Sequence, residues 1–180
     1  EEIGRRINEE LVATWGNLVN RVLSMVYRSC DGAVPAGEGR TAEDLAVLAT
    51  VDAALATVTD QIERVELRAA LRTGMDAAAS VNVYLNATEP WKLAKTDPER
   101  ARVVLGTALA AVAGVRVSLS PYLPFTTLAL DNVFGPVDAW GRVEPVPGTP
   151  VPKPTPLFAK IDLDELVESQ LPANQPPSGQ

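Results

Sequence analysis

The sequence predicts an all-α fold, an antiparallel bundle of about five helices over residues 1–135 followed by an extended, proline-rich tail over 136–180. Three observations predict it. Apolar residues recur at alternating spacings of four and three, which places them on one face of a helix. The chain is 46% hydrophobic but only 5% aromatic, which suits helices that pack closely on small residues. Ten of its 15 prolines lie after residue 135, where regular helix should therefore end.

The first helix is predicted from Leu11 to about Cys30. A cluster of turn residues over 31–39 ends it. Its apolar stripe has a 4-3-4-3 spacing and consists of Leu11, Trp15, Leu18, Val22 and Met25. The second helix begins at Thr41, because Thr41 and Asp44 have the spacing of a capping box, and it continues to about Asp60.

The third helix is predicted from Glu63 to Ala87, ending before Pro90 because a residue that precedes proline is pushed out of the helical region. Asp97 as N-cap and Pro98 at the first helical position then start a fourth helix. This helix reaches residue 118 and should be the most buried of the bundle.

The last helix of the bundle runs from Tyr122 or Pro124 to Phe134, and Gly135 ends it. From Pro136 onward the chain should be extended over the bundle surface rather than form a second domain. We expect one short helix in this tail, near 161–169, and disorder at the very end.

The composition excludes several classes of function. The chain has no His and one Cys, which removes imidazole catalysis, His-ligated zinc and an intramolecular disulfide. No phosphate-binding loop, nucleophile elbow or calcium loop is present, so we predict no catalytic residue, no metal site and no cofactor in this chain. The first residues lack a secretory apolar stretch, and the longest apolar run, 103–115, is shorter than the roughly 18 residues of a membrane span. These features indicate a cytoplasmic protein with no membrane partner.

A polar stripe on the first helix is the main candidate binding surface. It steps by four, three and four through Asn17, Arg21, Ser24 and Arg28. Asn and Arg side chains can hydrogen-bond the edges of nucleic-acid bases, and Arg can also stack. The alternative is an ordinary solvated helix face, which the net charge of −7 also favours, since RNA binding needs clustered cations.

Trp91 and Asn82 are secondary candidates. Trp91, flanked by two lysines, could be a stacking platform for a base. A Trp directly after a helix-ending proline is more often a buried plug at the end of a bundle, and this is the prediction. Asn82 is interpreted as a capping or bridging amide in the interior.

Four segments together resemble the C-terminal anticodon-binding domain of methionyl-tRNA synthetase, a class I aminoacyl-tRNA synthetase. They cover nearly the whole chain in order, and the most specific is the Asn-x-Tyr block with its Pro-Trp. The segments are GNLVNR (16–21), NVYLNATEPWKLAK (82–95), LSPYLP (119–124) and PLFAKI (156–161).

The resemblance implies a helical bundle that grips the anticodon stem-loop of methionine-accepting tRNA and reads CAU. It places Asn17 and Arg21 against anticodon bases and brings Lys160 of the closing segment near the anticodon loop. Arg28, further along the stripe, is expected to contact phosphate. The family also often has a base-stacking Trp about twenty residues before the Asn-x-Tyr block, but here that position is Ile62.

The resemblance further implies that this chain is part of an enzyme. The family's catalytic motifs are absent, so the chain alone should be inactive, and ATP, methionine and magnesium would serve the full enzyme. Its implied partners are tRNA and the catalytic domain of the same enzyme. Two alternatives stay open: a helical protein-interaction module derived from such a domain, and the anticodon domain of another class I synthetase.

Overall fold

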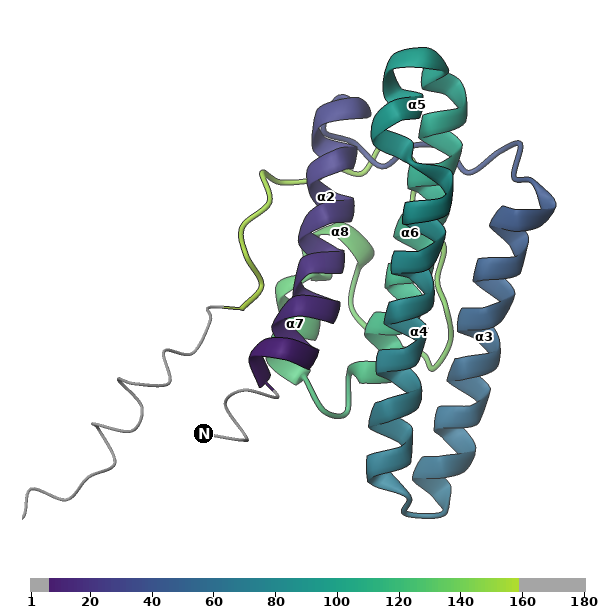
Figure 1. Cartoon of the computed structure of the whole chain (residues 1–180). Helices are drawn as coiled ribbons and strands as arrows, with labels where there is room; N and C mark the ends of the chain where they lie inside the picture. Colours follow the sequence, from purple (N-terminus) through teal and green to yellow (C-terminus); the bar gives the residue numbers. More distant parts are fainter. Residues whose placement is uncertain (1–6, 159–180) are drawn as a thin grey trace, which may run out of the picture.

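The computed structural model describes residues 7–158, and within that range the chain is helical except for its connections and tail (Figure 1). The predicted all-α class is confirmed. The one β pairing among the described residues is an isolated antiparallel bridge between Ala33 and Pro150. In chain order the helical elements are η1 (Ile7–Gly16), α2 (Asn17–Ser29), α3 (Ala42–Glu63), α4 (Leu67–Thr88), α5 (Pro90–Thr96), α6 (Pro98–Leu119), α7 (Pro124–Ala129) and α8 (Asp131–Phe134).

The long helices stand side by side along the bundle. A short turn joins α3 to α4 at one end, and α5 joins α4 to α6 at the other (Figure 1). Helix α6 packs against α2, α3, α4 and α5, and as predicted it is the most buried helix. Close approach depends on small residues, because a Cβ added to Gly74 of α4 would lie 2.8 Å from the Leu119 side chain of α6.

The predicted start signals of two helices are confirmed. Asp44 accepts a hydrogen bond from the backbone N–H of Thr41 at 2.8 Å, and the Thr41 hydroxyl accepts one from the N–H of Asp44, which completes the capping box. Asp97 accepts from the N–H of Arg100 at 3.1 Å, and Pro98 occupies the first helical position of α6. Local chemistry therefore sets where α3 and α6 begin.

Three predicted boundaries differ from the structure. Helix α4 begins at Leu67 instead of Glu63, because α3 extends to Glu63 and the chain reverses through Val65 with a left-handed φ of 61°. The predicted last helix is divided at Leu130 into α7 and α8. The first helix begins at Ile7 instead of Leu11, and it is π-helical over η1 before it becomes α-helical at Asn17.

Helix α5 was not predicted. Pro90 was interpreted as the end of α4, but it also begins a new seven-residue helix. The two functions are compatible, because the first residue of a helix has no intrahelical partner for its N–H and so tolerates proline. The change of direction occurs at Glu89, which adopts a left-handed conformation with φ 44°.

Burial of Arg116 explains how α7 and α8 are held on α6. Its guanidinium donates to the carbonyl of Thr127 at 3.0 Å and to that of Gly135 at 2.8 Å, and it pairs with Asp131. Burial lowers the pKa of Arg116, while the carboxylate of Asp131 opposes this shift. These contacts satisfy a charge that would otherwise be costly in the interior.

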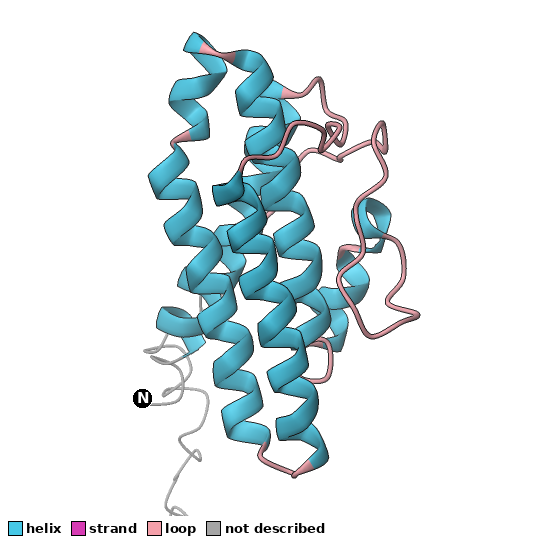
Figure 2. Cartoon of the chain, turned by 90° about the vertical axis from the view of Figure 1, so that its right-hand side faces the viewer, coloured by secondary structure: helices cyan, strands magenta, loops and turns pink. Residues whose placement is uncertain are grey.

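The tail up to residue 158 is extended and lies over the bundle, as Figure 2 shows. The N–H of Val151 donates to the carbonyl of Gly32 at 2.7 Å, and the N–H of Val34 donates to that of Thr149 at 2.9 Å. Both valines are buried in the hydrophobic core. The predicted short helix near 161–169 and the disordered end lie outside the described residues.

Charged side chains attach the middle of the tail to α3 and to the segment just before it. Arg142 donates to Asp52 at 2.9 Å, and Glu144 accepts two hydrogen bonds from Arg40, at 2.9 and 2.8 Å. The hydrogen bonds from Arg40 are the largest influence lowering the pKa of Glu144. The tail is thus attached at two places, by charges near 142–144 and by backbone pairing near 149–151.

Cys30 closes α2 beside the place where the tail pairs with the 32–34 segment. Its thiol is buried and free. Desolvation raises the pKa of the thiol to about 11, against a smaller opposing influence of Arg102. The group is therefore protonated at neutral pH.

Two helices, α3 and α6, have the length and apolar composition of a membrane span. In α6, 89% of the apolar window is buried inside the bundle, so core packing accounts for its hydropathy. In α3 that share is 28%. Two such helices are weak evidence for a membrane.

Candidate nucleic-acid interface

The polar stripe of α2 faces outward because the opposite side of the helix is fully used by the core. Leu18, Val19, Val22, Leu23 and Val26 are buried. Asn17 and Arg28 are exposed, and Arg21 is partly exposed. Asn17 and Arg21 are four residues apart, so their side chains lie one above the other on the same face.

Trp91 is the residue that the structure places differently from the prediction. The ring is 38% exposed, so the prediction of a buried plug is wrong. The reason is the orientation of α5, in which Pro90 is buried and Leu93 packs against the core. Trp91 therefore lies toward the surface.

Arg21 and Trp91 form one unit at the junction of α2 and α5. The guanidinium carbon of Arg21 lies 4.8 Å from the centroid of the Trp91 ring, within the range of a cation–π interaction. The Nη2 atom of Arg21 also donates to Oδ1 of Asn86 at 2.8 Å. Helices α2, α4 and α5 thus each contribute one side chain to this contact.

Asn86 is a site residue that the sequence reasoning missed. It is exposed on the last turns of α4 and accepts the hydrogen bond that orients Arg21. The signal was present in the sequence, since Asn82 and Asn86 are one turn apart in the same block. What the sequence could not show is that α2 lies beside this turn.

Asn82 makes the bridge that was predicted for it. Its amide donates to the carbonyl of Thr14 in η1 and to that of Ala78 in its own helix, both at 3.4 Å. The side chain is partly buried rather than fully buried. It holds η1 against α4 below the Arg21–Asn86 contact.

A buried ionic cluster supports the end of the bundle that carries α5. Asp44 of α3 has no exposed surface. It accepts from the Tyr84 hydroxyl of α4 at 2.5 Å and from both terminal nitrogens of Arg100 of α6, at 2.5 and 2.8 Å. Because α5 begins six residues after Tyr84 and ends four residues before Arg100, the cluster holds the two helices to which α5 is attached.

The surroundings of Asp44 favour its ionised form. Burial alone would raise the pKa of Asp44, but the hydrogen bonds from Arg100, Tyr84 and Thr41 outweigh it and lower the pKa to about 2. Burial and the hydrogen bond to Asp44 raise the pKa of Tyr84. The hydroxyl of Tyr84 thus stays protonated and donates to a carboxylate.

The remaining predicted positions lie elsewhere. Ile62 is in the last turn of α3, at the opposite end of the bundle from α5 (Figure 1), so it is not beside Arg21. Lys160 lies outside the described residues. Among residues 7–158, no group of three His, Cys, Asp or Glu side chains could hold a metal ion.

Comparisons with known proteins agree with this architecture. Residues 34–171 match the model of the anticodon binding domain of methionyl tRNA ligase. Methionine–tRNA ligase of Beutenbergia cavernae is 41% identical over 94% of this chain and 33% of its own length. That of Thermobifida fusca is 36% identical over 94% of the chain and 34% of its length.

Solved structures agree as well. Mycobacterium tuberculosis methionyl-tRNA synthetase in its free state is 29% identical, with a TM-score of 0.80 over 89% of this chain and 34% of that one. The same enzyme in complex with methionyl-adenylate gives 0.78 over 86% of this chain and 32% of that one. The chain spans about a third of the length of the relatives it matches. With more than half of its residues matched by the family model, this chain belongs to the family of anticodon-binding domains of methionyl-tRNA ligase.

Proposed function

We propose that this chain recognises the CAU anticodon of methionine-accepting tRNA through Asn17, Arg21 and Trp91. The observation that carries the proposal is an exposed indole ring with an arginine held against it, in a member of this family. Single-stranded RNA loops are read by stacking unpaired bases on aromatic or guanidinium planes and by hydrogen-bonding their edges. This surface offers both kinds of contact at one place.

Trp91 acts as the stacking platform. An unstacked anticodon base covers the exposed part of its ring, and such stacking contributes about 1–3 kcal/mol per base. The guanidinium of Arg21, which Asn86 orients, lies 4.8 Å from the centroid of the ring. The ring is therefore in place before RNA arrives, which lowers the ordering cost of binding.

Arg21 and Asn17 read base edges. The hydrogen bond to Asn86 uses one N–H of the Arg21 guanidinium, which has five. The others are available to a base, while Asn17 supplies an acceptor and a pair of donors one helical turn away. Two side chains so placed can reach one base or two adjacent unstacked bases.

Arg28 and Lys160 complete the proposed interface. Arg28 lies on the same side of α2 as Arg21, two turns further along, and contacts a backbone phosphate. Lys160 approaches the anticodon loop from the closing segment, and the family resemblance supports this assignment.

The chemistry belongs to the rest of the enzyme. Because the chain spans a third of its relatives, we propose that aminoacylation, with ATP, methionine and magnesium, takes place in a separate catalytic domain. The present chain is inactive alone, carries no cofactor and acts in the cytoplasm. Its partners are the tRNA and that catalytic domain.

A protein-interaction module is the competing function, and the net charge of −7 favours it. Against it stands the exposed Arg21–Trp91 pair, which a protein partner does not specifically require. An anticodon domain of another class I synthetase is disfavoured by the family match.

The deciding experiment compares two RNA hairpins that differ only in the anticodon, one bearing CAU and one bearing another triplet. Binding to the chain is measured at two salt concentrations, because affinity for RNA depends on salt. The proposal requires tighter binding of the CAU hairpin at both. Equal affinities would favour the protein-interaction function.

A further inference from the structure

Most arginines of the described chain are neutralised by acids. Seven of the ten between residues 7 and 158 have a carboxylate within 4 Å: Arg40, Arg64, Arg72, Arg100, Arg102, Arg116 and Arg142. The other three are Arg21, Arg28 and Arg68, which have no described acid within that distance, and we call them the arginine row. In a chain of net charge −7, these three arginines are available to phosphate without first breaking a described ion pair.

The arginine row lies along one face. Arg28 follows Arg21 by seven residues, about two turns, so both share a side of α2. Arg68 precedes Asn86 by eighteen residues, which is five turns, so both share a side of α4. Asn86 binds Arg21, and η1 packs against the part of α4 that precedes Asn86. The row therefore follows the seam that η1 and α2 together form with α4, which we call the α2–α4 seam, and Arg68 lies where α4 begins.

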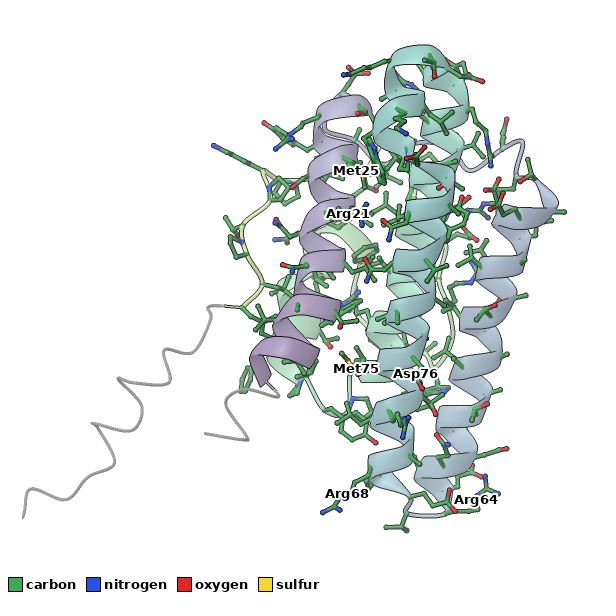
Figure 3. All side chains as sticks on the ribbon, in the orientation of Figure 1. Arg21, Met25, Arg64, Arg68, Met75 and Asp76 are labelled. Atoms are coloured by element: carbon green, nitrogen blue, oxygen red, sulfur yellow. The ribbon has the colours of Figure 1, made fainter. Side chains whose placement is uncertain are left out.

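Figure 3 shows this arrangement. Arg21 lies at the seam, and Arg68 lies at the foot of α4 with its side chain pointing away from the bundle. The distance along α4 from Asn86 to Arg68 is about 27 Å, at about 1.5 Å per residue. This distance equals about eight stacked nucleotides at roughly 3.4 Å each. Bases held at Trp91 therefore cannot contact Arg68, but the stem attached to them can.

Between the two ends, η1 packs against one side of α4, and the strip of α4 beside it is exposed. Ala79 is exposed and lies about 20° from the line of Arg68 and Asn86, where a small side chain permits close approach. The described acid of this stretch, Asp76, lies about 80° round the helix and is 3.9 Å from Arg72. The Asp76 side chain therefore lies off the line of Arg68 and Asn86, and Arg72 partly neutralises its charge.

We propose that Arg68 binds a backbone phosphate of the anticodon stem, so that the RNA hairpin lies along the α2–α4 seam with its loop on Trp91. The inference rests on the proposed function and adds the direction in which the stem leaves the loop. A phosphate contact fixes register and orientation and carries no sequence information. Arg68 therefore strengthens binding equally for every anticodon.

The test uses Arg68→Gln, with Arg64→Gln as the matched control. Both residues are exposed at the same end of the bundle, and both changes remove one positive charge, but Arg64 lies at the foot of α3, away from the seam (Figure 3). Two CAU probes are titrated over a range of salt. One is a complete anticodon stem-loop, and the other is the same loop closed by a short G·C stem that cannot reach Arg68.

The expected result is specific to one variant and one probe. Arg68→Gln weakens binding of the complete stem-loop several-fold and lowers its slope of log affinity against log salt by about one. The short hairpin is unaffected, and Arg64→Gln changes neither probe. An unchanged slope, an equal loss for both probes, or an equal effect of both variants would overturn the proposal.

The proposed function is tested separately within the same titrations. If the wild-type chain prefers CAU on the short hairpin while Arg68→Gln has no effect on the complete stem-loop, the stem contact alone is wrong. If the wild-type chain shows no preference on the short hairpin, anticodon reading is wrong whatever Arg68 does. Absence of binding to either probe would overturn both. Circular dichroism should give the same melting profile for the two variants, since surface substitutions change stability by about 0.5 kcal/mol or less.

Discussion

The ring of Trp91 lies on the surface of α5, while Pro90 and Leu93 of the same helix face the bundle. Trp91→Ala should therefore reduce affinity for a CAU hairpin by about 1–3 kcal/mol, the contribution of one stacked base. The free energy of unfolding should fall by only about 1–2 kcal/mol, below the 3–5 typical of a buried ring. Titration and thermal melting of the same sample measure the two effects.

Trp140→Ala is the matched control for Trp91, because that ring is 44% exposed and belongs to the tail. It should leave RNA binding unchanged. If instead Trp91→Ala loses binding only in proportion to unfolded protein, the ring has a structural role and the stacking assignment is wrong.

Asn17 and Arg21 carry the second prediction at this scale. Asn17→Ala and Arg21→Ala should each reduce the preference for CAU over other anticodons by about 1–3 kcal/mol, the discrimination of one base-edge contact. Arg28→Ala should reduce affinity for all anticodons alike and lower the salt slope by about one, because it removes a phosphate contact. Competition binding with hairpins of several anticodons separates the two patterns.

The control for Asn17 and Arg21 is a set of hairpins with identical stems. Equal losses for every anticodon in both variants would assign these side chains to the RNA backbone. No loss in either variant would favour the protein-interaction function.

At the scale of elements, the Asp44 cluster joins α3, α4 and α6 beneath α5 and should make stability depend on pH. The pKa of Asp44 is lowered from 3.8 to about 2 in the folded chain. A lowered folded-state pKa stabilises the fold above the unfolded pKa and loses this effect as pH falls through the folded pKa. Stability should thus decrease by about 2 kcal/mol between about pH 4.5 and pH 2, as followed by denaturant unfolding.

Asp44→Asn provides the comparison for that pH profile. Leaving Arg100 without its buried partner should cost about 3–5 kcal/mol at neutral pH. The part of the acid-induced loss that belongs to Asp44 should disappear in the variant. An unchanged slope of stability against pH would show that other carboxylates account for it.

A second prediction at this scale concerns the contact of α3, α6 and the tail. A Cβ on Gly114 would lie 2.5 Å from Cγ1 of Val51 and 3.2 Å from Cδ of Arg142. Gly114→Ala should destabilise the fold by about 1–3 kcal/mol through overpacking, although alanine is the better helix former. Gly141→Ala, where nothing lies within 4 Å, is the control, and equal melting temperatures for the two variants would contradict the prediction.

Elements were predictable where their signals are local. Thr41 with Asp44, and Asp97 with Pro98, act within four residues, so the starts of α3 and α6 could be found without tertiary information. Helix α5 could not be predicted in this way. A proline that only ends α4 and a proline that also begins α5 give the same local sequence. Which of Pro90, Trp91 and Leu93 faces the core depends on the neighbouring helices, and that choice decided the placement of Trp91.

The site was predictable to the same extent. The exposed stripe of Asn17, Arg21 and Arg28 follows from the periodicity of one helix. The contribution of Asn86 and the exposure of Trp91 require the packing of α2 against α4 and α5, which connects positions 65 residues apart.

At the scale of the whole molecule, the tail contributes Val151 to the hydrophobic core of the bundle. The division of the chain at residue 135 stays a prediction, and Val151 gives a way to test it, because this valine is buried with the bundle residues. Truncation after Gly135 should lower the free energy of unfolding by at least about 2 kcal/mol, the transfer free energy of one buried valine. Denaturant titration measures the change.

Truncation after residue 158 is the control, since it removes only residues outside the described range. The difference between the two truncations isolates the contribution of residues 136–158. If the two truncated chains are equally stable, the bundle is a self-sufficient domain and residues 136–158 contribute nothing to its stability.

The buried thiol of Cys30 can report local opening of the fold. As the single cysteine, with a pKa of about 11, it reacts with an alkylating reagent only during excursions that expose it and release a proton. Its surroundings are the end of α2 and the 32–34 segment on which the tail pairs. The labelling rate at low reagent concentration therefore measures the fraction of molecules in which this region is open, without any engineered probe. A slower rate in the presence of RNA would mean that binding along α2 reduces opening at the end of this helix, where Arg28 also lies.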